Sequence, residues 1–125
     1  MEVNAEIESF IYFSLQRAMN EKKMFLNCGL TLANLSRHLK TNRTYLSLTI
    51  RKNCNSSFVD YVNLHRVNEA RKLLSDVSTK NYTLEAICKM AGFQSKSTFN
   101  NAFKKFVGLT PSEFRRFSFK RLVNQ

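Results

Sequence analysis

The segment from residue 91 to residue 111 constrains the fold of this chain more than any other feature. It reads AGFQSKSTFNNAFKKFVGLTP. Gly92 tolerates the positive φ that a tight turn between two helices needs, and Ser95 is a favourable N-cap residue. Aromatic residues then recur at i, i+4 and i+7 and so share one helix face: Phe99, Phe103 and Phe106. The segment therefore predicts a turn followed by a short helix with a buried aromatic face.

The end of this segment predicts where that helix stops and the next begins. Gly108 can end a helix in the left-handed conformation, and Thr110-Pro111 is typical of a new helix start with proline at its first position. The rest of the helix surface is polar and basic: Lys96, Ser97, Asn100, Asn101 and Lys104. A short helix of this kind suits insertion into a DNA major groove, as in helix-turn-helix proteins.

Composition favours a polyanionic partner and argues against several other classes. The chain has 125 residues, with 20 Lys and Arg against 9 Asp and Glu, a net charge of +11. Three separated cysteines without a CxxC pair indicate reduced thiols, and the two histidines lack metal-ligand spacing. No nucleophile–base arrangement or phosphate-binding glycine loop is found. We expect no enzyme activity, no cofactor, no metal and no small-molecule site.

The pattern of breakers and apolar residues predicts an all-α fold. One proline, three glycines and little β-branched alternation leave helices as the main element. The expected inner face of the first helix, from about Asn4 to Asn20, consists of Ile7, Phe10, Ile11, Ser14 and Ala18. Further helices are expected over residues 31–39, 43–53, 58–75, from Thr83 onward, and over 96–107.

An internal repeat divides the chain into two similar units. Residues Thr31, Leu32 and Leu35 match Thr83, Leu84 and Ile87 at an offset of 52, and after the turn the offset is 53. The later pairs are Leu46 with Phe99, Ile50 with Phe103, and Asn55 with Gly108. The second copy therefore has one extra residue in its turn. Asparagine also tolerates the left-handed helix stop, so Asn55 fits the position of Gly108.

The repeat predicts two homeodomain-like helix-turn-helix subdomains, a bipartite arrangement with an N-terminal helix. A helix of about eighteen residues, roughly 27 Å long, would join them. The expected boundaries are 1–22 for the N-terminal helix, partly a leader to an upstream module, 23–57 for the first unit, 58–76 for the linker helix, and 77–125 for the second unit with a basic C-terminal helix.

The second unit and the linker resemble AraC/XylS-type bacterial transcription regulators from about Leu30 to Arg116. The similar stretches are Ala91-Gly92-Phe93 through Ser95, Phe99, Phe103-Lys104, Gly108, Thr110-Pro111 and Phe114-Arg115, together with residues 58–63 and 66–74. The resemblance implies a seven-helix DNA-binding domain that acts on transcription. It also implies RNA polymerase and an upstream sensor or dimerisation domain as partners.

Carried over position by position, the resemblance implies base reading by two helices, and the basic residues taken with the motif predict the phosphate contacts. Base reading falls on Thr44, Ser47, Leu48, Lys96, Ser97, Asn100 and Asn101. Phosphate contact is expected at Arg43, Arg51, Lys52, Thr98, Lys104, Lys105 and Arg115. The chain departs from the family pattern at Lys40, where glycine is common, and at Leu48 and Asn101, where basic or amide residues are frequent. Leucine can contact a thymine methyl but cannot hydrogen-bond to guanine.

Two further expectations concern partners and location. Phe10, Tyr12 and Phe13 form an apolar run that covers more than one helix face, so part of it is a candidate contact for an upstream domain or a second subunit. We expect a cytoplasmic, nucleoid-associated protein, with a membrane anchor in the full-length protein left open. The alternative function is a basic helical adaptor that binds protein or RNA instead of duplex DNA.

Overall fold

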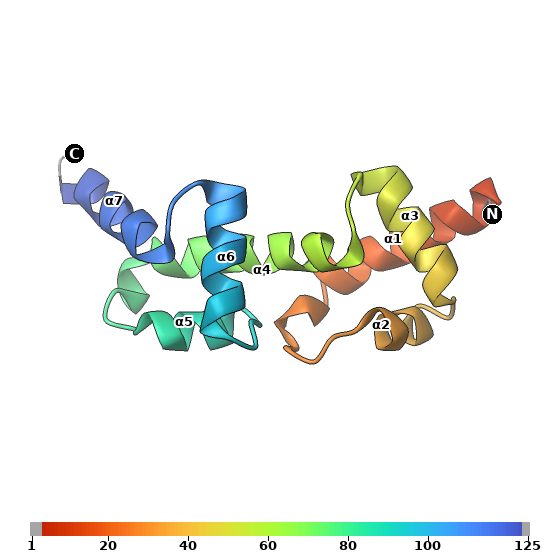
Figure 1. The fold of residues 1–125 in the computed structure, drawn as a ribbon, viewed down its shortest axis with the longest axis horizontal. Helices are drawn as coiled ribbons and strands as arrows, with labels where there is room; N and C mark the ends of the chain where they lie inside the picture. Colours follow the sequence, from red (N-terminus) through yellow and green to blue (C-terminus); the bar gives the residue numbers. More distant parts are fainter. Residues whose placement is uncertain (1–3, 124–125) are drawn as a thin grey trace. The chain divides into compact units, whose positions relative to one another are not determined.

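The structure, a computed structural model, describes residues 4–123, which form helices joined by turns and loops (Figure 1). Residues 1–3 of the predicted N-terminal segment and residues 124–125 of the predicted second unit lie outside the described part. Within it are seven α helices, two 3-10 helices and no strand, which confirms the all-α prediction. The α helices are α1 Ala5–Asn20, α2 Leu32–His38, α3 Arg43–Cys54, α4 Phe58–Leu74, α5 Leu84–Met90, α6 Lys96–Val107 and α7 Pro111–Val123; the 3-10 helices are Met24–Leu26 and Val77–Thr79.

The chain forms two compact units, Met1–Val62 and Asn63–Gln125, and the boundary falls inside α4. The first turns of α4 contribute Val62 to the core of the first unit. Its later turns contribute Val67, Ala70 and Leu74 to the core of the second unit. Each unit therefore contains part of the predicted linker helix.

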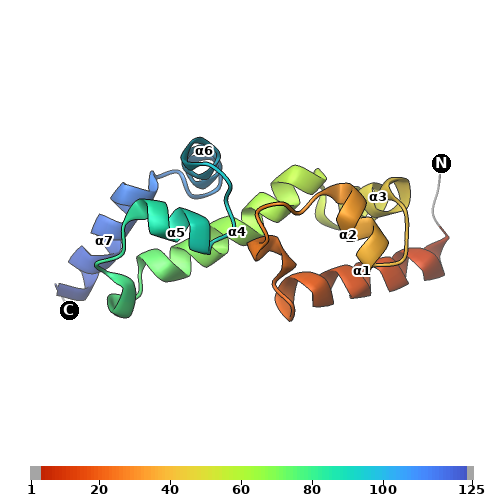
Figure 2. The same cartoon turned by 90° about the horizontal axis from the view of Figure 1, so that it is seen from below.

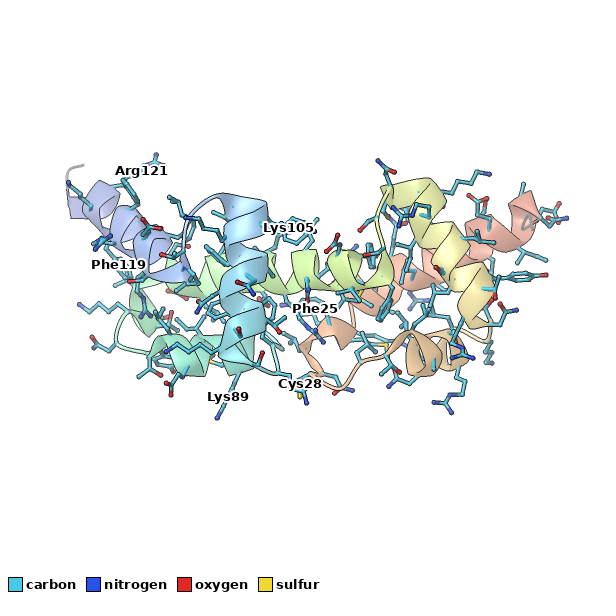
Figure 3. All side chains as sticks on the ribbon, in the orientation of Figure 1. Phe25, Cys28, Lys89, Lys105, Phe119 and Arg121 are labelled. Atoms are coloured by element: carbon cyan, nitrogen blue, oxygen red, sulfur yellow. The ribbon has the colours of Figure 1, made fainter. Side chains whose placement is uncertain are left out.

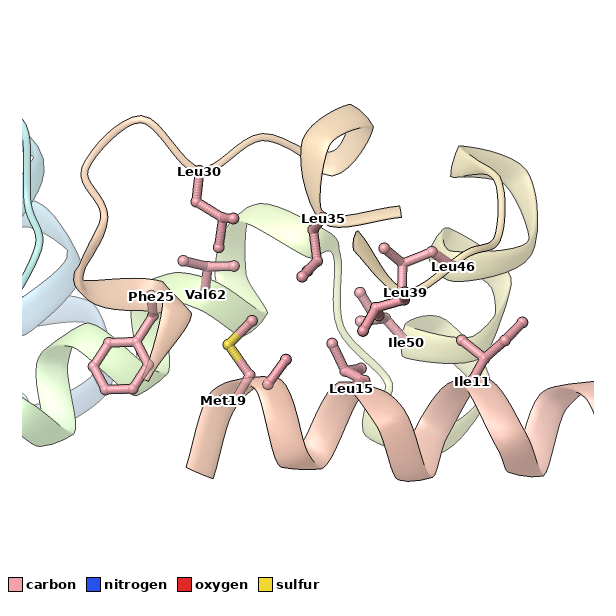
Figure 4. Packing of buried hydrophobic residues seen from close by; sticks show 11 residues of the cluster. Ile11, Leu15, Met19, Phe25, Leu30, Leu35, Leu39, Leu46, Ile50 and Val62 are labelled. Atoms are coloured by element: carbon pink, nitrogen blue, oxygen red, sulfur yellow. The ribbon is translucent and has the colours of Figure 1, made fainter. Parts of the chain in front are cut away.

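The core of the first unit is built on α1, as Figure 4 shows. The face of α1 that packs inward is Ile11, Leu15, Ala18 and Met19. It meets leucine and isoleucine side chains from α2 and α3: Leu35, Leu39, Leu46 and Ile50. This cluster gives the first unit an apolar core of its own.

The prediction for the inner face of α1 was partly wrong. Ile11 and Ala18 are buried as expected, but Ile7 is 45% exposed and Phe10 is 62% exposed. The buried positions follow the spacing i, i+4, i+7 and i+8 from Ile11, so the helix is rotated relative to the predicted face. The sequence alone does not determine this rotation, because the apolar run from Phe10 to Phe13 places apolar residues on several sides of the helix.

Aromatic residues form the core of the second unit. Phe93, Phe99 and Phe103 are nearly inaccessible to solvent. The ring centroids of Phe93 and Phe99 are 5.2 Å apart, those of Phe99 and Phe103 6.0 Å, and those of Phe103 and Phe114 5.5 Å. These spacings are those of favourable tilted and edge-to-face pairs. Phe99 and Phe103 are interior, as the spacing of α6 predicted, whereas Phe106 is half-buried against the same core.

The two helix-turn-helix turns differ by one residue, as the repeat predicted. In the first unit the C-cap of α2 is Leu39 and the N-cap of α3 is Asn42. In the second unit the C-cap of α5 is Ala91 and the N-cap of α6 is Ser95. The residue after each C-cap has a positive φ, 59° at Lys40 and 94° at Gly92. Lysine thus occupies a left-handed position that glycine fills in the second copy.

Local signals also determine the helix ends. Asn55 and Gly108 end α3 and α6 in the left-handed conformation, with φ of 48° and 84°. Thr110 begins α7 with a capping box: its Oγ1 accepts from the amide of Glu113, and its own amide donates to the Glu113 carboxylate. None of the helices in the described part is both long and apolar enough to cross a membrane.

Candidate nucleic-acid interface

Helix α6 has one buried face and one polar, basic, exposed face. Phe99, Ala102 and Phe103 are buried and hold the helix to its unit. Every predicted contact residue on α6 is exposed: Lys96, Ser97, Thr98, Asn100, Asn101, Lys104 and Lys105. Figure 3 shows the side chains along this helix, with Lys105 labelled. The structure therefore brings all seven predicted residues of α6 together on the solvent side of one helix.

Capping interactions fix the first turn of α6. The hydroxyl of Ser95 accepts a hydrogen bond from the amide of Thr98 at 3.1 Å and donates one to the Thr98 hydroxyl at 2.9 Å. Figure 2 shows α6 seen close to its axis, with α5 leading into it. The Nζ of Lys96 lies 3.9 Å from a carboxylate oxygen of Glu85 on α5. Glu85 is a contact that the sequence analysis did not identify.

Helix α3 repeats this arrangement in the first unit. Its N-cap Asn42 accepts from the amide of Tyr45 at 2.8 Å, and Leu46, Thr49 and Ile50 are buried. The predicted contact residues Arg43, Thr44, Ser47, Arg51 and Lys52 are exposed, and Leu48 is half-buried. The hydroxyl of the buried Thr49 donates to the carbonyl of Tyr45, so it is satisfied within the helix.

Every charged residue of α3 and α6 is basic. Each has three basic residues and no acidic residue, Arg43, Arg51 and Lys52 on α3 and Lys96, Lys104 and Lys105 on α6. Basic residues in the last turn also interact favourably with the helix dipole. Each helix therefore presents a positive surface beside short polar side chains, and both kinds of side chain are common in protein–DNA contacts.

One of the predicted phosphate contacts already has a partner. The Nζ of Lys52 lies 2.9 Å from Oε2 of Glu8, and the amide of Asn53 donates to Oε1 at 3.1 Å. The hydrogen bond from Lys52 lowers the pKa of the Glu8 carboxyl. Glu8 therefore connects α1 to the last turn of α3. No local sequence signal marks this pair, because 44 positions separate the residues.

Arg115 occupies a structural position that the sequence analysis did not predict. Its Nη1 donates to the carbonyl of Tyr82 at 2.7 Å, and its Nη2 donates to the carbonyl of Thr79 at 3.0 Å. The guanidinium thus holds the loop after the 3-10 helix Val77–Thr79 against α7. We therefore leave Arg115 out of the phosphate contacts proposed below.

The thiols and the possible metal ligands are further reactive groups of the described part. No cluster of histidine, cysteine, aspartate or glutamate residues there could hold a metal ion. Burial raises the pKa of both Cys54 and Cys88, which keeps these thiols protonated. Cys28 is exposed, Cys54 is half-buried and Cys88 is buried.

Comparisons with known proteins agree with this geometry. The family model of a helix-turn-helix domain matches residues 35–116, more than half of the chain. The melibiose operon regulatory protein of Escherichia coli K12 is 32% identical over 93 residues, which are 74% of this chain and 30% of that protein. The chain spans about a third of the length of the curated relatives it matches.

Solved structures of helix-turn-helix DNA-binding domains also resemble this chain. The C-terminal domain of AraT, a response regulator from Geobacillus stearothermophilus, has a TM-score of 0.73 and 28% identity, covering 86% of this chain and 84% of that one. The DNA-binding domain of AdpA, solved in complex with a target DNA, shares the fold with a TM-score of 0.75 at 18% identity, covering 89% and 94%.

The fold, the two exposed basic helices and the matches to known proteins together define a DNA-binding helix-turn-helix domain of a transcription regulator. The chain belongs to the AraC/XylS-type family of these regulators.

Proposed function

We propose that this chain binds duplex DNA in a sequence-dependent manner, with α3 and α6 as recognition helices in adjacent major-groove segments. The observation that carries the proposal is the exposed face of α6, where amide, hydroxyl and ammonium groups stand opposite a buried aromatic face. The relatives named as operon regulators support placing this binding in transcription control at the bacterial nucleoid.

The side chains on α6 have the chemistry of direct base reading. Asparagine can pair with N6 and N7 of adenine, and lysine can donate to O6 and N7 of guanine. Asn100, Asn101 and Lys96 supply these groups, and Ser97 can donate or accept. On α3 the corresponding groups are Thr44, Ser47 and Leu48, whose apolar side chain suits a thymine methyl. The first unit is therefore proposed to read fewer hydrogen-bonding features than the second.

Phosphate contacts are proposed for the cationic residues at the borders of the same helices. They are Arg43, Arg51 and Lys52 on α3 and Lys104 and Lys105 on α6, with the Thr98 hydroxyl as a neutral contact. Lys52 is already paired with Glu8, so the other four cationic contacts predict a log–log salt dependence with a slope of about −3.6. Such contacts position the protein on DNA without selecting a sequence.

Helix α4 supports simultaneous binding of both units. It has 17 residues, which at a rise of 1.5 Å per residue is about 25 Å. One turn of B-DNA is about 34 Å, and the proposal requires the two recognition helices to reach successive groove segments at that spacing. The expected site is asymmetric and longer than one helical turn for a single chain.

Selection of bound sites from a random duplex library tests the proposal. We expect one asymmetric footprint of about two turns per chain. Asn100→Ala and Lys96→Ala should relax base preference in one half of the site, each by about 1–3 kcal/mol of discrimination. Lys105→Ala should weaken binding to all sequences alike, and Lys72→Ala, an exposed cation outside both helices, is the control.

Two results would overturn the proposal. Equal losses on every probe for Asn100→Ala, Lys96→Ala and Lys105→Ala would remove base reading. RNA of equal length that binds as well as the selected duplex would favour the adaptor function instead.

Protein partners form the second part of the proposal. The family relationship supports a contact with RNA polymerase and with a sensor or dimerisation module, the latter through the exposed Phe10 and Phe13 of α1. Tyr12 is half-buried against the core of the first unit, so it is the least accessible of the three predicted contacts. Transcription with purified polymerase from the selected site tests the first contact.

A further inference from the structure

The first unit has a groove of about 300 Å³ between α1 and the end of α2. The residues that matter for its chemistry are Phe10, Phe13, Arg17, Lys22, His38 and Lys40. The predicted recognition residues of α3 are absent from the lining, so this groove is a separate feature of the unit.

Two aromatic side chains make the groove apolar on its α1 side. Phe10 is 62% exposed and Phe13 is 61% exposed, and their spacing of three residues puts them side by side on the helix. The opposite face of α1 is the buried one that contains Ile11 and Leu15. Two large aromatic residues exposed together on one helix face are typical of a protein-binding surface.

Basic groups surround this apolar surface. Arg17, Lys22 and Lys40 all line the groove, and no lining residue is acidic. The Nζ of Lys22 lies 3.4 Å from Nε2 of His38. Arg17 is bound to Glu21 at 3.2 Å, but both side chains are more than half exposed, so the pair can exchange with a carboxylate at little cost.

We infer that this groove binds an acidic amphipathic helix of a partner protein. Apolar side chains at i, i+3 or i+4 of the partner would pack on Phe10 and Phe13, and flanking aspartate or glutamate residues would pair with Lys22, Lys40 and Arg17. DNA lacks the apolar part of this ligand, and a second copy of a chain with net charge +11 would bring like charge to the basic rim.

This inference rests on the proposal that α1 contacts another protein module, but it does not depend on DNA binding. A display library of random 16-residue peptides, panned on the full 125-residue chain in the presence of excess duplex DNA, tests it. The DNA occupies the proposed recognition helices, so that peptide selection reports on other surfaces. We expect selected peptides rich in Asp and Glu, with apolar residues at helical spacing.

Variants connect the selected peptides to the groove. Phe10→Ser with Phe13→Ser, and separately Lys22→Glu, should each weaken binding of a selected peptide at least tenfold by fluorescence anisotropy. Phe117→Ser is the matched control, because Phe117 is 55% exposed on α7 in the other unit, and it should leave peptide affinity unchanged. A charge-reversed peptide, with Lys in place of each Asp and Glu, should not bind.

DNA binding by the same variants separates this inference from the proposed function. The Phe10 and Phe13 double variant should shift the selected duplex as the unchanged chain does, which also shows that it is folded. The inference is overturned if no peptide is selected, if the peptides are basic, or if the groove variants bind them normally. Self-association that the double variant abolishes would assign the groove to a second copy instead.

Discussion

The ammonium of Lys52 and the carboxylate of Glu8 are 2.9 Å apart and connect two helices that are far apart in the sequence. The Glu8 carboxylate also accepts from Asn53 and is largely shielded, whereas the Lys52 side chain is 72% exposed. Lys52 can therefore reach a phosphate only in competition with Glu8. This arrangement makes an acidic residue on α1 a modulator of the predicted DNA surface on α3.

Glu8→Gln should strengthen DNA binding at low salt and steepen its salt dependence. The substitution keeps a hydrogen-bond acceptor for Asn53 but removes the charge that holds Lys52. If Lys52 then gains one full phosphate contact, the log–log slope becomes steeper by about 0.9. Titrations from low to moderate salt measure the slope. Glu6→Gln, an exposed acid in the same first turn of α1, is the control and should leave it unchanged.

The same carboxylate predicts a pH dependence of stability. Its folded-state pKa is depressed by the Lys52 hydrogen bond, so the stabilising contribution is complete above the pKa of the unfolded chain. It is lost as the pH falls through the lower, folded-state pKa. Chemical denaturation across the acidic range should show a smaller loss of stability for Glu8→Gln than for the unchanged chain. This account would be contradicted if the free energy of unfolding depended on pH in the same way for both proteins.

Gly108→Ala should destabilise the second unit through its backbone alone. Gly108 has φ of +84°, and a Cβ built there would meet no atom within 4 Å. The expected cost is therefore the strain of a left-handed alanine, about 1 kcal/mol, without a steric clash. Thermal unfolding measures it. Gly29→Ala is the control, since Gly29 has no positive φ and its added Cβ would make an ordinary contact with Asn27; its unfolding temperature should change less.

Alkylation should distinguish the three cysteines. Cys28 is exposed, whereas burial raises the pKa of Cys54 and Cys88, and the Cys88 thiol also donates to the carbonyl of Ser95 at 3.6 Å. We expect iodoacetamide at mildly alkaline pH to modify Cys28 roughly ten times faster than the other two. Mass spectrometry of digested samples measures the rates. Denaturant should make them similar, and equal rates in the folded protein would contradict the packing described for Cys54 and Cys88.

Local sequence signals predicted most of the fold. Ser95 and Thr110 cap helices where expected, and Asn55 and Gly108 end them. These signals work because a cap or a left-handed stop involves groups only a few residues apart. The same is true of the aromatic spacing of α6, since one helix face is determined by its own periodicity.

The remaining features depend on contacts between distant residues. The rotation of α1 is set by what it packs against on α2 and α3, and the apolar run at Phe10 permits more than one rotation. The pairing of Glu8 with Lys52 and of Arg115 with the carbonyls of Thr79 and Tyr82 joins groups more than thirty positions apart. A local sequence pattern does not show such distant partners, so Lys52 and Arg115 were both predicted as phosphate contacts from their positive charge and the surrounding helix-turn-helix motif.

Arg115→Met tests which role that arginine has. A structural role predicts a loss of about 1–3 kcal/mol in the free energy of unfolding, because two backbone carbonyls lose a charged donor. Methionine keeps much of the apolar stem, so the loss reports mainly on the guanidinium. Arg116→Met, an exposed neighbour, is the control for removing one positive charge from α7. DNA titrations at a temperature where both variants remain folded complete the test. If Arg115 is structural, the two variants should have the same salt slope and differ in stability. If Arg115 binds phosphate, its variant should keep its unfolding temperature and show a salt slope shallower by about 0.9.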